Sequence, residues 1–323
     1  RPPRSTLFPY TTLFRSFTVA DFQPGHSLKL ARSDTYHGTK AASNVVEFMQ
    51  YSDADALSKA LTDGSLDMAA PVSASTATGL NGKDGLTVKE GATTDKVLLA
   101  YNNGTDSLLS DEQARKAFRY QIDAAGIASA QPDAAGALGG PISLLEPGYE
   151  DLTGLYPHDE NQAGQMFSYF GAQYLTTVNL VVPEEYRSLA ETIKQQIERQ
   201  PRPTVNLEVL SDEDYAKRIK DGKWELTVMS MDGTDDAGIF ADPDSMFHYD
   251  HTEAQQAYAD ARAATNDADY EARMKAYARL ISEDAASDWL YTRKCFTVAS
   301  TKVSGYPTSM INRRMPLAGL TVK

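Results

Sequence analysis

Two neighbouring segments carry the clearest structural signal in the chain: Lys96-Val-Leu-Leu-Ala-Tyr-Asn102, and Ser-Asp-Glu-Gln-Ala-Arg-Lys-Ala-Phe-Arg-Tyr-Gln-Ile-Asp at 110–123. The first is a short apolar run, which is typical of a buried strand. In the second, Ser110 and Gln113 have the spacing of a capping box, and apolar residues recur after them on one helical face. A buried strand that leads into an amphipathic helix predicts an α/β unit.

The alternation of strand and helix continues on both sides of this unit. Residues 45–51 have the β-branched and aromatic content of a strand. Asp53 can cap a helix that Gly64 ends, and 66–69 then resemble the next strand, so we expect a strand–helix–strand unit. Further strands are predicted at 28–32, 177–182, 205–209, 224–231 and 289–299, further helices at 159–171, 184–200, 211–219, 253–265 and 267–286, and a long loop at 126–149. This order predicts the α/β class with largely parallel or mixed sheets.

Size and composition narrow the class of protein. The chain has 323 residues, enough for one large or two ordinary domains, and 41% of them are hydrophobic, so it can bury a core. A net charge of −13 argues against a nucleic-acid partner, which requires a basic surface. The single cysteine, Cys295, excludes an intrachain disulfide and a cysteine-rich zinc site. The sequence contains no run of about eighteen apolar residues, so it predicts no membrane-spanning helix.

The first sixteen residues do not look like part of the fold. They lack an initiating Met and contain Thr-Leu-Phe twice, at 6–8 and 12–14, and they resemble the translated adapter peptides found at the ends of assembled metagenomic sequences. On this interpretation residues 1–16 are an artefact and the native chain begins near Phe17. The alternative is a genuine short basic arm. Residues 1–16 do not have the pattern of a signal peptide.

No pattern of catalytic residues is present in the sequence. A Gly-x-Ser-x-Gly turn, a phosphate-binding P-loop and a Gly-x-Gly-x-x-Gly loop are all missing. His248 and His251 form the closest histidine pair, and with nearby aspartates they are weak candidates for a transition-metal site; the alternative is a polar loop before a helix. We therefore expect a protein that is not an enzyme and needs no cofactor.

Several segments in a consistent order resemble the extracytoplasmic solute-binding proteins of ABC transporters in the oligopeptide, dipeptide and nickel family, family 5. The most specific is Leu99-Ala-Tyr-Asn102 followed by the helix at 114–123. The helix at 53–68, which runs into Gly, one residue and an apolar-Asp pair, is similar to a family segment. The same holds for Tyr156-Pro-His-Asp159 with Ala163 and Gly171, for the Asp242-Pro-Asp244 turn, and for the late helix at 270–285. Together these segments cover nearly all of residues 17–323.

The resemblance implies a fold and a domain arrangement. The fold is a two-lobed, periplasmic-binding-protein-like α/β fold of class II, with a partial first lobe and a near-complete second lobe. Lobe one takes residues 17–98, lobe two takes 99–295, and 296–323 return to lobe one. The resemblance also implies that a signal peptide, a lipid-anchoring cysteine and a first large segment are missing. We expect exposed apolar patches where the missing strands would pack.

The resemblance also implies a ligand site. Peptide-binding members hold the amino group of the ligand with an Asp after the Trp-led strand, here Trp224–Met231. This favours Asp235 or Asp236, with Asp232 nearby; the alternative is a turn-forming acidic loop. Some relatives bind the peptide carboxylate with an Arg in that strand, but this sequence has none there. Tyr101 and Asn102 at a predicted crossover, and the aromatic side chain of Trp289, are further candidates.

The function implied is that of a receptor that binds oligopeptide- or dipeptide-like solutes in an interlobe cleft and delivers them to a permease. Such a receptor is an extracytoplasmic monomer, either free in the periplasm or on the outer face of the cell membrane, where the missing N-terminal anchor would hold it. Three alternatives remain open: a receptor for a metal chelate such as nickel, a non-transport surface protein, and an enzyme on the same scaffold.

Overall fold

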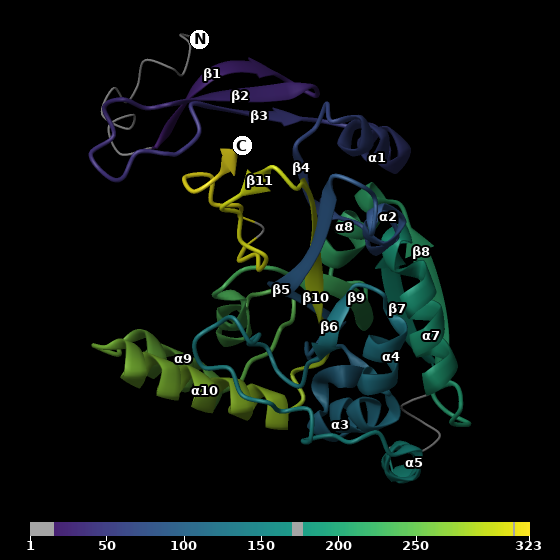
Figure 1. The fold of residues 1–323 in the computed structure, drawn as a ribbon. Helices are drawn as coiled ribbons and strands as arrows, with labels where there is room; N and C mark the ends of the chain where they lie inside the picture. Colours follow the sequence, from purple (N-terminus) through teal and green to yellow (C-terminus); the bar gives the residue numbers. More distant parts are fainter. Residues whose placement is uncertain (1–15, 170–176, 313) are drawn as a thin grey trace, which may run out of the picture. The chain divides into compact units, whose positions relative to one another are not determined.

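The computed structural model describes residues 16–169, 177–312 and 314–323, and the chain divides into two compact units (Figure 1). Unit 1 contains the residues up to Gly91 together with Cys295–Met310 and Arg314–Lys323, and unit 2 contains Ala92–Lys294 and Ile311–Arg313. The first boundary comes earlier than residue 98, where the sequence places the end of lobe one. Two long strands, β5 (Leu86–Tyr101) and β10 (Ser287–Ser300), belong in part to each unit.

Unit 1 begins with an antiparallel sheet and continues with two helices. The sheet has the order β1 (Phe17–Gln23), β2 (Ser27–Arg32), β3 (Val45–Met49), and is followed by α1 (Ala54–Asp63), β4 (Met68–Val72) and α2 (Ala74–Leu80). Near the C-terminus, β11 (Val303–Ser304) pairs with β12 (Thr321–Val322). As predicted, Asp53 caps α1 by accepting a hydrogen bond from the Ala56 amide at 2.7 Å, and Gly64 ends it with a φ of 77°.

The predicted strand–helix–strand order is present as β3, α1 and β4, and the two strands that flank α1 lie in different sheets. β3 pairs with β2, whereas β4 pairs with β10. The reason is the small core of unit 1, where Val72 of β4 packs with Val298 of β10 and with Leu61 of α1. Burial of β4 against a strand from the far end of the chain replaces pairing with its sequence neighbour.

The sheet of β1, β2 and β3 carries exposed apolar side chains. Its register places Leu28 opposite both Phe22 and Phe48. Side chains of directly paired residues lie on the same face of a sheet, so these three form an apolar row across it. Phe22 is 61% exposed and Phe48 44% exposed. The row is therefore an apolar patch that is partly exposed in this structure.

The main sheet is mixed, as the alternation of elements predicts. Within the described residues its strands have the order β4-β10-β5-β9-β7-β8, and β6 (Ala134–Ala137) pairs with β10. The remaining strands of this sheet are β7 (Thr177–Pro183), β8 (Thr204–Leu210) and β9 (Leu226–Met231). β7 is parallel to β8 and β9, whereas β5 is antiparallel to β9.

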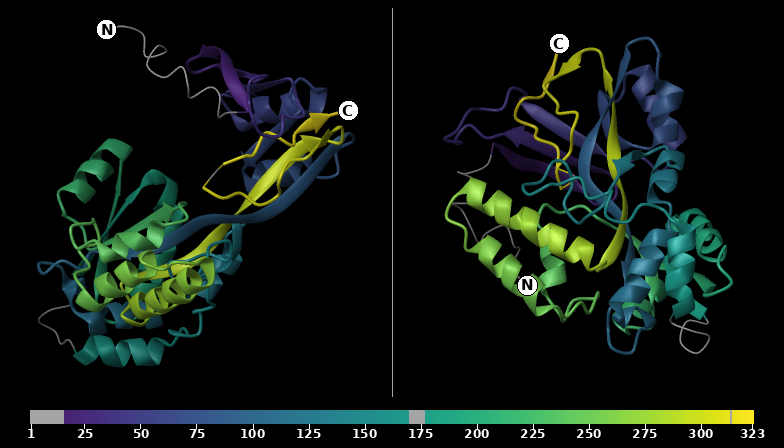
Figure 2. Two further views of the ribbon diagram at one scale, coloured as in Figure 1. Left: turned by 90° about the vertical axis from the view of Figure 1, so that its left-hand side faces the viewer. Right: turned by 90° about the horizontal axis from the view of Figure 1, so that it is seen from below.

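Helices cover both faces of the sheet in unit 2, because alternate side chains of a strand point to opposite faces. Val97, Leu99 and Tyr101 of β5 pack with α3 (Glu112–Gln121), α4 (Ala124–Ala130), α5 (Glu160–Tyr169) and α7 (Arg187–Ile197). Leu98 and Ala100 pack with α9 (Thr252–Arg262) and α10 (Asp267–Glu283), and α8 (Asp212–Lys220) contributes to the same core. Both views show α9 and α10 side by side (Figures 1 and 2).

Helix α3 begins one residue later than predicted, and its cap is Asp111 rather than Ser110. The Asp111 carboxylate accepts a hydrogen bond from the Gln113 amide at 2.8 Å. Ser110 instead ends a short 3-10 helix, η2 (Leu108–Ser110), and its hydroxyl donates to the Ser107 carbonyl. The predicted capping box is therefore wrong, because two adjacent residues can cap and the 3-10 turn places the aspartate in position.

Replacing Asp111 by alanine is expected to lower the free energy of unfolding by about 1 kcal/mol, because an amide in the first turn of α3 loses its acceptor. Ser110→Ala is expected to lower the free energy of unfolding by only about 0.3 kcal/mol, since the Ser110 hydroxyl donates to the preceding turn and accepts no hydrogen bond from the helix. Urea unfolding of the two variants measures both values. Equal losses would contradict the assignment of Asp111 as the cap.

The region predicted as a loop at 126–149 contains the end of α4 and all of β6. Asp123 caps α4 by accepting a hydrogen bond from the Gly126 amide at 2.8 Å, and the alanines that follow are good helix formers. The helix predicted at 184–200 begins with a 3-10 turn, η3 (Glu184–Tyr186), before α7. Asp159 caps α5 as predicted, but Phe170 and Gly171 lie outside the described residues.

Candidate functional site

The loop that follows β9 lies at the edge of the sheet that suits ligand binding. Because β7, β8 and β9 are parallel, their carboxyl ends lie at one edge. In open α/β sheets, ligands bind in the crevice outside the carboxyl ends of the strands. Residues 232–241, here called the acidic loop, leave β9 at this edge and contain the predicted ligand-binding residues Asp232, Asp235 and Asp236.

Asp236 belongs to a buried cluster of charges. The Nζ atom of Lys96 lies 2.9 Å from Glu146 Oε2 and 3.6 Å from Asp236 Oδ2. Lys96 Nζ also donates to the carbonyl groups of Thr94, at 3.0 Å, and Gly233, at 2.9 Å. Its three hydrogens therefore have three acceptors without Asp236. Burial raises the pKa of Asp236, and the charge of Lys96 partly offsets this shift.

Asp235 is the more exposed carboxylate of the acidic loop. Its Oδ1 atom accepts a hydrogen bond from the Tyr258 hydroxyl at 3.0 Å, and its Oδ2 atom lies 3.5 Å from Arg262 Nη1. The side chains of Asp235 and Arg262 are both about half exposed, so water screens this ion pair and a solute can compete for either partner. Burial, together with Asp235, raises the pKa of Tyr258 to about 12, so its hydroxyl remains a donor at neutral pH.

Contacts from three elements fix the backbone of the acidic loop. The Gly233 amide donates to Asp236 Oδ2 at 2.6 Å, and a Cβ atom on Gly233 would lie only 2.3 Å from Asp236 Oδ1. The Tyr277 hydroxyl of α10 donates at 2.7 Å to a carbonyl of the 3-10 helix η4 (Asp236–Ala241). Thr94 Oγ1 donates to the carbonyl of Asp232 at 2.6 Å. These contacts organise the loop before any ligand arrives, which favours binding.

Two of the predicted site residues are buried in the core. Tyr101 is 0% exposed and Trp289 is 1% exposed. The Trp289 ring packs against Phe240 at 5.6 Å between ring centroids, and the Arg119 guanidinium lies 5.4 Å from its centroid. Neither side chain presents a surface to a solute in this structure. The apolar runs that contain them suit core strands equally well, so the sequence alone does not separate the two roles.

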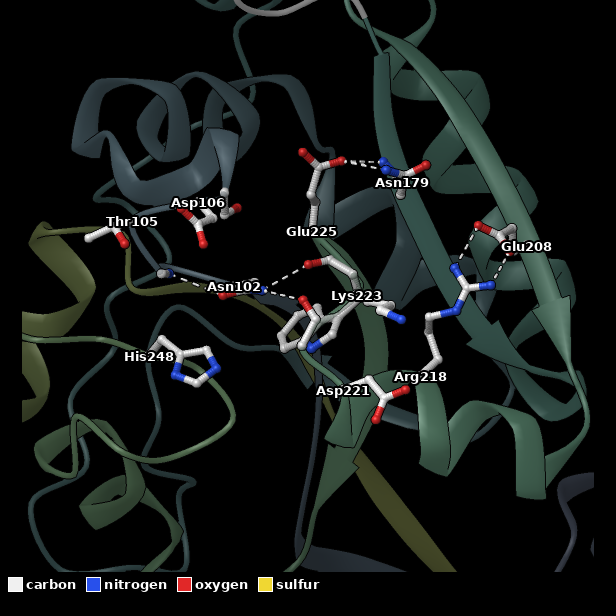
Figure 3. Close-up of a pocket in the computed structure, with 14 residues that line it drawn as sticks. Asn102, Thr105, Asp106, Asn179, Glu208, Arg218, Asp221, Lys223, Glu225 and His248 are labelled. Atoms are coloured by element: carbon white, nitrogen blue, oxygen red, sulfur yellow. Dashed lines mark hydrogen bonds and ion pairs between the residues drawn. The ribbon is translucent and has the colours of Figure 1, made fainter.

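Asn102 and His248 lie together in a polar pocket of about 600 Å³ at the other end of β9 (Figure 3). Asn102 is buried, and its amide donates to the carbonyl groups of Gly222, at 3.3 Å, and Trp224, at 2.9 Å. Asn102 therefore fixes the wall of the pocket, because its two amide hydrogens are already bound within the protein.

Three of the charged residues that line this pocket are held by other lining residues. Glu225 Oε2 accepts two hydrogen bonds from Asn179, at 2.7 and 3.0 Å, and burial raises the pKa of Glu225. Arg218 binds Glu208 through both carboxylate oxygens, at 3.0 and 2.8 Å (Figure 3). Ligand pockets are mostly apolar with a few polar groups, whereas this one is polar and lies away from the carboxyl ends of the parallel strands. The acidic loop is the better candidate site.

The two histidines proposed for a metal do not form a shared site with other ligands. His251 Nδ1 accepts a hydrogen bond from the Ala254 amide at 3.3 Å and so caps α9, and its ring stacks on Tyr249. His248 faces the polar pocket. In the described part of the chain, no group of three His, Cys, Asp or Glu side chains is arranged to hold a metal ion. The same residues contain no helix that is both long and apolar enough to cross a membrane.

Sequence reasoning missed Lys96 and Glu146, which set the charge around Asp236. A lysine at the start of an apolar run such as 96–102 is a weak signal of a buried cation, because most lysines are exposed. Glu146 lies in an irregular segment with no pattern of its own. Only the fold brings the two together, since η2, α3, α4 and β6 separate them in the chain.

Several solved structures share this fold. The ABC transporter substrate-binding protein CtaP from Listeria monocytogenes has a TM-score of 0.83 and 14% identity, and the match covers 96% of this chain and 66% of that one. The oligopeptide-binding protein AppA from Bacillus subtilis, in complex with a nonapeptide, has a TM-score of 0.72, 16% identity and coverages of 95% and 66%. NikA from Brucella suis, in complex with Fe(III)-EDTA, has a TM-score of 0.76, 15% identity and coverages of 95% and 68%.

These likenesses establish the two-lobed binding-protein fold that the sequence predicts, and the chain spans about two thirds of the length of each structure. The chain matches no curated protein sequence. The model of one family, described as bacterial extracellular solute-binding proteins, family 5, matches residues 16–258, which is most of the chain. The protein is therefore a member of the bacterial extracellular solute-binding proteins of family 5.

Proposed function

We propose that this protein is the receptor of an ABC importer and binds oligopeptide- or dipeptide-like solutes on the outer side of the membrane. It binds and releases its solute without chemical change and delivers it to a permease. The observation that carries the proposal is the acidic loop, a preorganised segment with two carboxylates, Asp235 and Asp236, at the carboxyl edge of the sheet. A peptide ends in an ammonium group, which such carboxylates bind through charge-assisted hydrogen bonds.

The fold neighbours support this class of solute. The Bacillus subtilis protein was solved with a nonapeptide, and a dipeptide-binding protein from a Pseudoalteromonas species was solved with Met-Leu. Both share the fold of this chain at 14–16% identity, so they support the fold, whereas the support for the class of solute comes from the acidic loop. The net charge of −13 further favours solutes that carry a positive group.

A thermal-shift measurement on the 323-residue chain tests the proposal. A protease digest of casein, present at roughly a hundred times its dissociation constant, is expected to raise the melting temperature by about 5 °C, because it binds only the folded state. The same digest with its amino groups acetylated is expected to cause no shift. The variant Asp235→Asn with Asp236→Asn is expected to lose the response.

A matched control is Asp212→Asn with Glu213→Gln, which removes the same charge from the exposed first turn of α8 and is expected to retain the response. If the digest causes no shift, the protein does not bind this class of peptide. If the acetylated digest stabilises the protein equally, the acidic loop does not bind an ammonium group.

A metal chelate is the second candidate solute, because the Brucella suis structure with the same fold holds Fe(III)-EDTA. Fe(III)-EDTA belongs in the same screen. A shift with the chelate and none with the digest would favour this alternative. Since EDTA chelates are anionic, such a shift is expected to survive the Asp235→Asn and Asp236→Asn changes.

A further inference from the structure

Lys96 is a buried lysine whose ammonium joins three segments of unit 2. Lysine side chains are seldom buried unless they are paired, yet Lys96 is 1% exposed. Its Nζ atom donates to a carbonyl of its own strand, β5, to Glu146 in the irregular segment before α5, and to the Gly233 carbonyl of the acidic loop. Glu146 Oε2 is held in turn by the Ser143 amide at 2.8 Å. The ammonium therefore determines where the first residues of the acidic loop lie.

The charges in this cluster do not balance. Lys96 has one positive charge, and Glu146 balances it through a direct hydrogen bond of 2.9 Å. Asp236 lies farther from the ammonium, at 3.6 Å, and it accepts a hydrogen bond from the Gly233 amide. The Asp236 side chain is 24% exposed, so it remains accessible from the solvent side. One carboxylate in excess, held in place and within reach of solvent, is suited to a cationic group.

We propose that Lys96 is the positioning residue of the acidic loop. Its ammonium holds the Gly233 carbonyl in place and keeps Asp236 ionised, so that Asp236 can accept a cationic group of the solute. This rests on the proposed function and assigns the ammonium contact to Asp236, with Asp235 beside it. A neutral residue at position 96 would remove the cation that opposes burial of the Asp236 carboxylate.

The charged groups around Asp236 determine the effect of neutralising Lys96. The titratable groups that face it or the residues next to it are Lys96 from β5, Glu146 from the irregular segment, Asp232 and Asp235 from the loop itself, Tyr258 and Arg262 from α9, and Tyr277 from α10. Of the two cations, Arg262 pairs with Asp235. Without Lys96, burial and Asp232 both raise the pKa of Asp236, so the carboxyl takes up a proton as the pH falls.

The test uses the variant Lys96→Met with Glu146→Gln, which removes both hydrogen-bonded charges together and so avoids an unpaired buried ion. In the wild type, affinity for the casein digest is expected to change little with pH. In the variant it is expected to fall about tenfold for each pH unit below the raised pKa of Asp236, and to recover as the pH rises. A loss of loop order alone would lower affinity equally at every pH. Titration calorimetry across a pH series measures both proteins.

Two further variants complete the design. Lys116→Met with Glu112→Gln removes a surface pair on α3 and is expected to keep the wild-type profile. Asp236→Asn is expected to abolish the preference for free over acetylated digest at every pH, and it remains informative if the Lys96 variant does not fold. Absence of binding by the wild type would reject the proposed function. A wild type that binds, with an unchanged pH profile in the Lys96 variant or an unchanged preference in Asp236→Asn, would reject the role of Lys96.

Discussion

Replacing Arg119 by methionine is expected to lower the free energy of unfolding by about 3–5 kcal/mol, because it leaves a buried carboxylate without its cation. Arg119 Nε lies 3.2 Å from Asp288 Oδ1, and both side chains are 4% exposed. The guanidinium also donates to the carbonyl groups of Ser282 and Gly139 and lies 4.7 Å from the centroid of the Tyr156 ring. The variant loses all of these contacts at once.

The dependence on pH identifies Asp288 as the cause. Burial raises the pKa of Asp288 to about 7, although Arg119 opposes the shift. A carboxyl whose folded pKa is raised holds its proton more tightly in the native state, so stability falls as pH rises from the unfolded pKa to the folded one. In the wild type this fall ends near pH 7. Without Arg119 the folded pKa lies higher, so the cost is expected to keep growing above that pH by about 1.4 kcal/mol for each unit.

Urea unfolding over a pH series measures this difference. The double variant Arg119→Met with Asp288→Asn serves as the control, because it removes both charges and is expected to recover part of the stability and to lose the extra dependence on pH. A single variant whose unfolding free energy runs parallel to that of the wild type above neutral pH would contradict the account.

Replacing Trp289 by alanine is also expected to cost about 3–5 kcal/mol, because the indole fills the core between the sheet and α10. Besides Phe240 and the Arg119 guanidinium, it is surrounded by the buried side chains of that core, so truncation leaves a cavity. Trp289→Phe keeps most of the volume and is expected to cost less. Thermal and urea unfolding report both values.

The same pair of variants decides between the two roles considered for Trp289. A core residue changes stability and leaves the affinity for the solute unchanged, provided that the measurement is made well below the melting temperature. If Trp289→Phe is as stable as the wild type but binds the casein digest more weakly, the tryptophan contacts the solute. In that case the protein binds its solute in a conformation that differs from this structure, in which Trp289 is buried.

Local patterns in the sequence were sufficient for most helices and strands, because burial imposes a period of two or of 3.6 residues on them. They did not predict which strands pair. The strand predicted at 66–69 pairs with β10, since pairing depends on a core built from both ends of the chain. The start of α3 was missed by one residue because Ser110 and Asp111 are both good caps.

The candidate site was predicted in outline and missed in its supporting residues. The acidic loop follows from its place after the Trp-led strand, and the structure ties it to Lys96, Thr94 and Tyr277. The partner of Asp236 could not be found from the sequence, because Lys96 lies far from it in the chain and nothing in the apolar run at 96–102 marks a lysine as buried. Tyr101 and Trp289 show the converse, since a large aromatic residue in such a run suits a wall of a cleft and a core equally.

The way in which β4 is paired constrains the order in which the chain can fold during synthesis. Val72 pairs with Phe296 and Ala69 with Val298, so the partner strand leaves the ribosome only after the whole of Ala92–Lys294. At the usual rates of translation this delay is on the order of ten seconds or more. The elements of unit 2 that precede β10 can form within this delay, but the main sheet is completed only when β10 emerges. The nascent unit 1 meanwhile holds an unpaired strand edge, the state in which proteins most readily aggregate or bind a chaperone.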